Sequence, residues 1–347
     1  MTGGIEVSAI RGVTKIAEEI PYKIIFFDKV NANLRNEIPD VARSNIIVVE
    51  GKCLLSRIVK LLLFIYSNQD SIYIFSTWRS IFVGMLSKRF LTKRNTVTFY
   101  HRSSPAHFMD ALMRKYAVKN SQFIMADCFE TLRSVPSSVQ CEKSVVRPIF
   151  NFEDSAHRGF VPTPPIKVCF VGRLSKVKNL PAIAMFMKCI TEMREDIVLD
   201  IFGADQGQMQ VMASLSSKYD IRNRVTFKGE ISPFEVGEIY SNSHFIISLS
   251  HTEGLAMNLV EAMTAGVIPI CGRKGGPNEY CVDGVNAIVL DDYSDSSIQT
   301  ACIRTIEVFE DKHIYRKMSE SAKKTFVEED FYEKNFINFI KERYGTN

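Results

Sequence analysis

Short apolar runs rich in β-branched and aromatic residues recur along the whole chain, and stretches of helical length separate them. Each run has the length and composition of a buried strand. Strands that alternate with helices predict an α/β fold with parallel sheets. The predicted strands are 23–28, 45–50, 71–76, 96–101, 122–127 and 144–149 in the first half, and 166–172, 198–203, 224–229, 245–250, 267–272 and 287–290 in the second.

A segment that disfavours regular structure divides the two series of strands. Residues 151–165 contain one glycine and three prolines. At 347 residues, the chain is also longer than a single core usually fills. We therefore predict two Rossmann-like domains, 1–150 and 166–325, joined by this linker. Residues 326–347 are predicted to contain an amphipathic helix, starting at residue 326, that returns to the first domain.

The start of the chain differs from the usual opening of a doubly wound domain. Gly3 and Gly4 precede a predicted helix over 5–19, whereas such a domain normally opens with a strand before its glycine-rich turn. We therefore expect that the first sheet lacks this strand or that the sequence starts one strand late.

Composition argues against several protein classes. No apolar run reaches the roughly 18 residues that a membrane span needs. The first residues lack the basic leader and the apolar stretch of a secretory signal. The eight cysteines are scattered without a Cys-x-x-Cys pair, so we expect buried thiols in a reducing compartment instead of disulfides or zinc ligands. These features predict a cytoplasmic protein.

The charges are divided unevenly between the two halves. Residues 1–150 carry 21 Lys and Arg against 12 Asp and Glu, a net charge of +9, and the remainder carries −5. A basic domain is attracted to anionic surfaces. Nucleic-acid binding would need cations interleaved with exposed aromatics along a groove, and this pattern is not evident.

Two basic segments with apolar residues lie in the first half. Residues 79–94 interleave large apolar side chains with four cations near their end, and Lys52, Arg57 and Lys60 precede another apolar run. Such segments can lie on anionic lipid, which predicts a peripheral contact with a membrane. The alternative is that the apolar stripe packs on the domain's own sheet.

One loop of the second half has the chemistry of a phosphate site. Gly172 ends the predicted strand 166–172, and Arg173 and Lys178 follow it. At the carboxyl end of a parallel strand, glycine lets the backbone approach a ligand, and two cations there can stabilise a departing diphosphate without a metal. An ordinary solvated loop is the alternative.

A second segment adds two carboxylates. Glu253 is predicted in the loop at the head of a helix, beside Gly254, and Glu261 about two turns inside it. Glu253 can accept hydrogen bonds from sugar hydroxyls, Glu261 can bind a ribose, and the free amides at the helix start can bind phosphate. Those amides belong to Leu255, Ala256 and Met257. The alternatives are that Glu253 caps the helix and that Glu261 is a surface residue.

The order of these motifs over 168–290 resembles the donor domain of retaining glycosyltransferase family four, including the E-x7-E spacing of Glu253 and Glu261. The resemblance implies a GT-B fold, two Rossmann-like domains that face across a cleft. It also implies that Arg173 and Lys178 hold the donor diphosphate, the first glutamate the sugar and the second the ribose. Leu255 and Ala256 depart from the family, which usually has an aromatic residue and a glycine there.

The first half resembles the family less closely. Gly3 and Gly4 are similar to its glycine-rich acceptor-side loop. His101 ends the predicted strand 96–101, where many members carry a histidine near the reacting sugar. The alternative for His101 is a strand-terminal histidine whose hydrogen bonds are satisfied by its neighbours.

The resemblance implies transfer from a UDP- or GDP-sugar to a glycan or undecaprenyl-linked acceptor, with retention of configuration, in bacterial surface-polysaccharide synthesis. It implies no cofactor and no metal. A sugar-nucleotide epimerase, another GT-B enzyme or a non-catalytic partner subunit are the alternatives. A nicotinamide-dependent oxidoreductase would need G-x-G-x-x-G after a strand, which is lacking.

Overall fold

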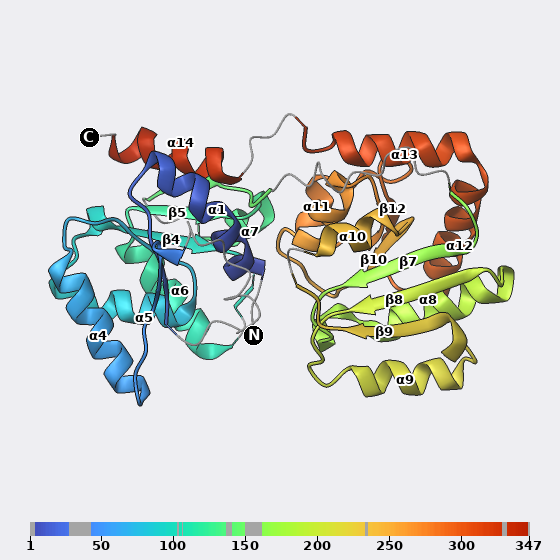
Figure 1. Cartoon of the computed structure of the whole chain (residues 1–347), viewed down its shortest axis with the longest axis horizontal. Coiled ribbons are helices and arrows are strands. Elements are labelled where there is room, and N and C mark those ends of the chain that lie inside the picture. The colour runs from blue at the N-terminus through green and yellow to red at the C-terminus, as the bar shows by residue number, and fades with distance from the viewer. Residues whose placement is uncertain are drawn as a thin grey trace. The chain divides into compact units, whose positions relative to one another are not determined.

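The chain folds into two compact units, each built around its own parallel sheets (Figure 1). Unit 1 comprises residues 1–148 and 331–347, and unit 2 comprises residues 149–330. The computed structural model describes residues 4–27, 43–102, 104–105, 107–136, 141–149, 162–232, 235–327 and 332–345.

Unit 1 has a four-stranded parallel sheet of order β3-β4-β5-β6 and a separate parallel pair, β1 and β2. Its strands are β1 (Ile24–Phe26), β2 (Ile46–Val48), β3 (Tyr73–Phe75), β4 (Thr96–Tyr100), β5 (Phe123–Ala126) and β6 (Glu142–Val145). Its helices are α1 (Gly4–Glu19), α4 (Leu54–Ser67), α5 (Trp78–Leu86), α6 (Phe108–Asn120), α7 (Phe129–Arg133) and α14 (Tyr332–Tyr344), with 3₁₀ turns η1 (Ser87–Arg89) and η2 (Lys93–Asn95).

Unit 2 has a six-stranded parallel sheet of order β12-β11-β10-β7-β8-β9. Its strands are β7 (Ile166–Val171), β8 (Ile197–Phe202), β9 (Val225–Gly229), β10 (Phe245–Ser248), β11 (Ile268–Gly272) and β12 (Ile288–Leu290). Its helices are α8 (Leu180–Met193), α9 (Met209–Lys218), α10 (Val236–Ser241), α11 (Met257–Thr264), α12 (Asp295–Glu310) and α13 (Lys312–Lys324), with 3₁₀ turns η4 (Lys176–Lys178), η5 (Arg222–Arg224) and η6 (Gly276–Glu279).

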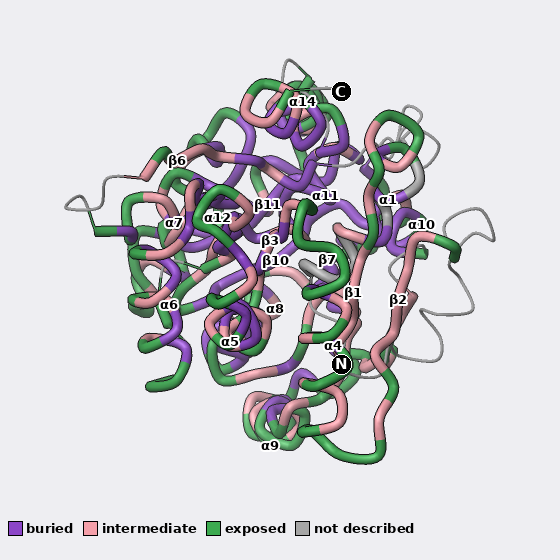
Figure 2. The backbone as a smooth tube through the Cα atoms, turned by 90° about the vertical axis from the view of Figure 1, so that its left-hand side faces the viewer, coloured by how far each residue is buried: buried purple, intermediate pink, exposed green. Residues whose placement is uncertain are grey.

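Each of the twelve predicted strands corresponds to a strand of the structure. The largest displacement is in β6, which covers 142–145 where 144–149 was predicted. Parallel strands covered by helices on both faces are apolar along their length, and β10 and β11 are buried at every position (Figure 2). Uninterrupted apolar runs in the sequence therefore predicted both strands.

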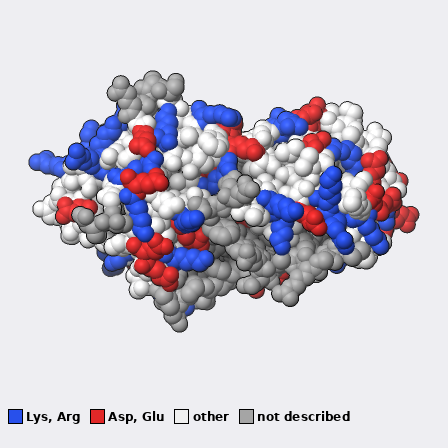
Figure 3. Space-filling model, turned by 90° about the horizontal axis from the view of Figure 1, so that it is seen from above, with Lys and Arg blue, Asp and Glu red and all other residues white. Residues whose placement is uncertain are grey.

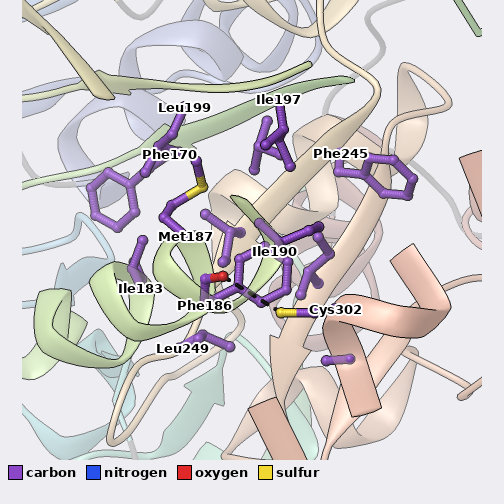
Figure 4. Packing of buried hydrophobic residues seen from close by; sticks show 14 of the residues in the cluster. Phe170, Ile183, Phe186, Met187, Ile190, Ile197, Leu199, Phe245, Leu249 and Cys302 are labelled. Carbon is purple, nitrogen blue, oxygen red and sulfur yellow. Dashed lines mark hydrogen bonds between the residues drawn. The ribbon is translucent and has the colours of Figure 1, made fainter. Parts of the chain in front are cut away.

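The core of unit 2 packs α8 against the sheet. Ile183, Phe186, Met187 and Ile190 follow helical spacing on α8, and all four are fully buried (Figure 4). The thiol of Cys302 on α12 donates to the carbonyl oxygen of Phe186 at 3.5 Å. α8 therefore packs against both the sheet and α12.

The C-terminal helix α14 packs on unit 1, whereas the two helices that precede it in sequence belong to unit 2. The rings of Phe339 and Tyr344 meet Phe123 of β5 edge-on, at centroid distances of 5.8 and 5.5 Å. The Lys341 ammonium binds the Glu19 carboxylate of α1 at 2.5 Å. Unit 1 is therefore assembled from two segments distant in sequence.

The predicted start of this helix at residue 326 is wrong. α13 ends at Lys324, and Phe326 is buried in unit 2 with its ring centroid 5.2 Å from that of Tyr280. The aromatic spacing of the sequence continues through this connection, so it does not mark where the helix begins. Residues 328–331 lie outside the described part of the chain.

At the N-terminal end, Gly4 is the first described residue and also the first residue of α1. The predicted helix is present. Gly3, and the position of the strand that was expected to be missing, lie outside the described residues.

The basic segment 79–94 forms α5, η1 and η2. Ile81 and Val83 of α5 are buried in the core of unit 1, with Phe82 and Met85 packed against that core. The apolar stripe of this segment therefore packs on its own domain, as the alternative predicted.

Candidate functional site

The order of the strands in unit 2 determines where its site residues lie. β7 lies between β8 and β10. From β7 the chain continues to β8 and β9 on one side of the sheet, and β10, β11 and β12 then extend the sheet on the other side. Loops that leave two such strands run in opposite directions and open a crevice at their carboxyl ends, where α/β sheets bind ligands. Residues 172–179 and 249–256 are these loops.

The two loops meet through an ion pair. Lys178, at the end of η4, places its Nζ 2.5 Å from Oε1 of Glu253, and the two side chains are only 19% and 13% exposed. Glu253 does not cap α11, because the residue at the cap position is Ala256. The structure therefore brings together two residues that the sequence predicted for one site, and the capping alternative is wrong.

Further hydrogen bonds fix the loops around this pair. The side-chain amide of Asn258 donates to the carbonyl oxygen of Val171 at 3.0 Å. The Tyr293 hydroxyl donates to the carbonyl oxygen of Ser250 at 2.6 Å. Sequence reasoning missed both roles: Asn258 is one polar residue within a helix, and Tyr293 comes about forty residues after Glu253, beyond two further strands.

Two glycines let a third loop approach the site. A Cβ on Gly275, whose φ is +72°, would lie 2.0 Å from the carbonyl oxygen of Glu253. A Cβ on Gly276 would lie 2.2 Å from the carbonyl oxygen of Gly254, which accepts a hydrogen bond from the Gly276 amide at 2.9 Å. No other residue type fits these distances, so the loop after β11 supports the backbone of the donor loop directly.

Arg173 lies at the carboxyl end of β7, immediately after Gly172, and is exposed. Among the residues that the structure describes, it has no ion-pair partner. A free guanidinium next to a neutralised Lys178–Glu253 pair leaves a net positive charge, which suits an anionic ligand.

Glu261 lies in the second turn of α11 and is buried. One of its carboxylate oxygens accepts a hydrogen bond from the hydroxyl of Tyr240, on α10, at 3.1 Å. The prediction of a surface residue is therefore wrong. A buried carboxylate needs partners, and this one is held by a fully buried tyrosine.

The head of α11 has an unusual backbone. Ala256 adopts φ +59° and ψ +67°, a left-handed conformation that costs a residue with a Cβ about 1–2 kcal/mol. The Leu255 side chain is buried, and its carbonyl oxygen accepts from the Tyr280 hydroxyl at 2.5 Å. Met257 is the first residue of α11, where backbone amides have no acceptor within the helix. Ala256 thus occupies a backbone position that favours glycine.

Replacing Ala256 with glycine is expected to raise the free energy of unfolding of unit 2 by about 1 kcal/mol, because glycine adopts a positive φ without steric cost. Urea unfolding followed by circular dichroism measures the change. Ala262→Gly, inside the same helix, is the control and should destabilise by about 1 kcal/mol. Equal effects of both substitutions would show that the conformation of Ala256 carries no strain.

His101 belongs to unit 1, directly after β4. Its Nε2 is buried without a hydrogen-bond partner in the described structure, and its ring lies 4.2 Å from that of Phe99. Burial, with the charges of Arg114 and Arg102, lowers the pKa of His101 to about 3. The imidazole is therefore neutral near pH 7, and its unpartnered nitrogen is not satisfied by neighbours as the alternative required.

In the described ranges no three His, Cys, Asp or Glu side chains are grouped so that they could hold a metal ion. No helix in these ranges is both long and apolar enough to cross a bilayer. That the reaction needs neither metal nor cofactor stays a prediction.

Comparison with known sequences places this site in a family. The profile of the family described as "Glycosyl transferases group 1" matches residues 152–325, half of the chain. An uncharacterised glycosyltransferase of Methanocaldococcus jannaschii is 29% identical over 180 residues, and a sucrose synthase of Melioribacter roseus is 24% identical over 225. These matches cover 51% and 57% of this chain but only 43% and 28% of the relatives' own lengths.

Comparison with solved structures extends over almost the whole chain. Anabaena HepE in complex with UDP and glucose superposes with a TM-score of 0.79, covering 98% of this chain and 96% of HepE at 14% identity. Sucrose-phosphate synthase from Thermosynechococcus elongatus gives a TM-score of 0.78, covering 98% of this chain and 93% of its own at 15% identity. The predicted fold is thereby confirmed: the chain has the GT-B fold and belongs to the glycosyl transferases group 1 family.

Proposed function

We propose that the chain is a glycosyltransferase that moves a sugar from a UDP- or GDP-sugar to a glycan or lipid-linked glycan acceptor, with retention of configuration. The contact between Lys178 and Glu253, in which Lys178 comes from the same loop as the exposed Arg173, carries this proposal. It places cations and a carboxylate at the edge of the sheet where nucleotides bind in α/β folds. The structure of HepE with UDP and glucose supports a donor of this class.

Each site residue has a proposed role. Arg173 and Lys178 hold the donor diphosphate, together with the free amides at the head of α11. Glu253 accepts hydrogen bonds from the hydroxyls of the transferred sugar, and Glu261 binds the ribose. In the structure, Lys178 and Glu253 neutralise each other. A bound diphosphate competes for Lys178, which leaves the Glu253 carboxylate free for the sugar.

The proposed reaction breaks the bond between the sugar's anomeric carbon and the diphosphate while an acceptor oxygen bonds the same face of that carbon. The acceptor's proton passes to the departing phosphate. Negative charge grows on the diphosphate as the bond breaks, so fixed cations stabilise the transition state more than the ground state. Arg173 and Lys178 supply this charge, so we propose that no metal is required. The neutral His101 offers a hydrogen bond to the reacting sugar.

We further propose a role in cell-surface polysaccharide synthesis, at the cytoplasmic face of the membrane, where a lipid-linked acceptor is found. The net charge of +9 over residues 1–150 supports an anionic partner for unit 1.

Thermal unfolding with UDP, GDP and their sugars tests the donor site. A nucleotide at a hundred times its Kd should add about 2.7 kcal/mol to the stability of unit 2. The nucleotide that stabilises is then offered as its sugar with and without a glycan acceptor, and NMR reports the anomeric configuration of the product.

Several outcomes would contradict the proposal. Turnover of the donor to an isomer without any acceptor indicates an epimerase. Donor binding without any product indicates a non-catalytic subunit. If no nucleotide raises the unfolding temperature, the donor site has been misassigned.

A further inference from the structure

Helix α4 has large apolar side chains on its outer face, although it belongs to a folded domain. Leu55, Val59, Leu63 and Tyr66 follow one another at intervals of four, four and three residues, so they form one stripe along the helix. All four are exposed, Leu55 by 69% and Leu63 by 60%. Exposed apolar patches of this kind mark contact sites.

The inner face of α4 is already accounted for. Leu61 and Ile65 are buried in the core of unit 1, and Leu62 and Phe64 pack against that core. α4 lies at the outer side of the unit, next to α5 (Figure 1). The outer stripe therefore does not contribute to the core of its own domain.

Positive charge accompanies this stripe. Residues 51–109 contain nine Lys and Arg and one acidic residue, Asp70. Lys52 lies exposed just before α4 and Lys60 lies exposed in its middle, where it donates to the carbonyl oxygen of Glu50 at 2.7 Å. Elsewhere, basic and acidic side chains are interspersed over the surface seen from above (Figure 3). The charge near α4 is thus predominantly positive, with Glu50 and Asp70 as the acidic residues that flank the helix.

A ring contact connects the end of α4 to further cations. Tyr66 meets Phe90 edge-on, at a centroid distance of 5.1 Å, and Phe90 lies between η1 and η2. These two turns carry exposed cations on either side of Phe90. The cations are Lys88, Arg89, Lys93 and Arg94.

We propose that the outer face of α4 docks on the surface of an anionic lipid bilayer. A helix lies in the interface when its apolar face enters the acyl boundary and flanking cations meet anionic headgroups. The stripe supplies the apolar face that enters the acyl boundary. The cations of α4, η1 and η2 supply the attraction to anionic headgroups. A tyrosine at the end of the stripe suits the same interface, because its ring is apolar and its hydroxyl polar.

This placement also orients the domain. α4 follows β2, so its first turn, with Leu54 and Leu55, lies toward the carboxyl ends of the strands, where α/β domains bind ligands. The inference rests on the proposed function in one respect: a lipid-linked acceptor would be presented at the carboxyl ends of these strands. Binding to lipid itself requires neither donor nor acceptor.

Vesicle flotation without donor tests the proposal. The wild-type chain should float with vesicles of phosphatidylcholine and phosphatidylglycerol, and not with phosphatidylcholine alone. Leu55→Glu and Leu63→Glu should each weaken binding about tenfold, because each leaves an apolar contact unmade and adds a repelled charge. Ile303→Glu, at an exposed position of α12 in unit 2, is the matched control and should bind as the wild type does.

A probe on α4 locates the contact directly. Cys53 is exposed immediately before α4, so an environment-sensitive fluorophore on its thiol should shift to shorter wavelength when anionic vesicles are added. Cys53→Ser treated in the same way corrects for label on other thiols. Fluorescence of Trp78, the chain's one tryptophan, verifies that unit 1 of each variant is folded.

The outcomes separate this inference from the proposed function. Absence of flotation at low salt, unaltered flotation of the glutamate variants, or an unshifted probe overturns the docking proposal. Self-association that Leu55→Glu abolishes also overturns it, because the face would then bind a second copy. Nucleotide stabilisation is measured on the same variants. If nucleotide stabilisation persists while flotation fails, only the docking proposal is wrong. If flotation persists without nucleotide stabilisation, only the donor site is wrong.

Discussion

Replacing Glu253 with glutamine is expected to lower kcat/KM for sugar transfer by about a thousandfold, while unit 2 stays folded. Glutamine keeps the size of the side chain but removes the charge that holds Lys178 at 2.5 Å and that would orient the sugar hydroxyls. Loss of one preorganised group in an active site typically costs a hundredfold to a thousandfold in rate. Release of the nucleoside diphosphate from the stabilising donor measures the effect.

Lys178→Met tests the other half of the pair. It removes a cation from the diphosphate and leaves a carboxylate that is 13% exposed without its ammonium partner. Because the two residues contact each other, their effects should not add, and the double variant should be close to the worse single variant. Lys176→Met, two residues earlier and exposed, is the control and should retain activity. Undiminished turnover of Glu253→Gln would mean that the carboxylate has no role in transfer.

Replacing Gly275 with alanine is expected to lower kcat/KM by about a hundredfold through the backbone alone. The added Cβ would lie 2.0 Å from the carbonyl oxygen of Glu253, so one loop must move. Displacing a reacting group by about 1 Å can cost two orders of magnitude in rate. The assay of donor turnover used for Glu253 measures this effect.

Gly284→Ala provides a closely matched control. Gly284 has φ +71° against +72° for Gly275, but its Cβ would meet only a guanidinium nitrogen of Arg304 at 3.6 Å, an ordinary contact. Both alanines therefore adopt a positive φ, which disfavours a residue with a Cβ, and only Gly275→Ala also places that Cβ against the backbone of the donor loop. Equal loss of activity in both variants would attribute the effect to general destabilisation.

The sequence predicted the strands far better than the contacts between them. The apolar runs identified twelve strands, because burial makes each strand a short apolar run in the sequence. The pairing of Lys178 with Glu253 spans 75 positions and follows from β10 lying beside β7. No local pattern specifies that order, and only the family resemblance placed the two residues in one site.

Other features depend on geometry that composition does not record. The left-handed backbone of Ala256 and the hydrogen bond from Tyr293 to Ser250 have no signal in residue spacing. The apolar stripe on α4 was noted only as an apolar run, because a sequence does not reveal which face of a helix its domain leaves uncovered. The segment 79–94 has the stronger basic pattern, although Ile81, Val83 and Leu91 of this segment are buried in the core of unit 1.

The packing of α14 on unit 1 has a consequence for synthesis on the ribosome. Unit 2 is one continuous segment, 149–330, so its core can close as soon as that segment has emerged. Unit 1 needs Phe336 and Phe339 of α14 against Tyr22 and Phe123, and these arrive only after unit 2 has been made. The domain translated first is therefore the one completed last, and until then its apolar surface under α14 remains open to chaperones.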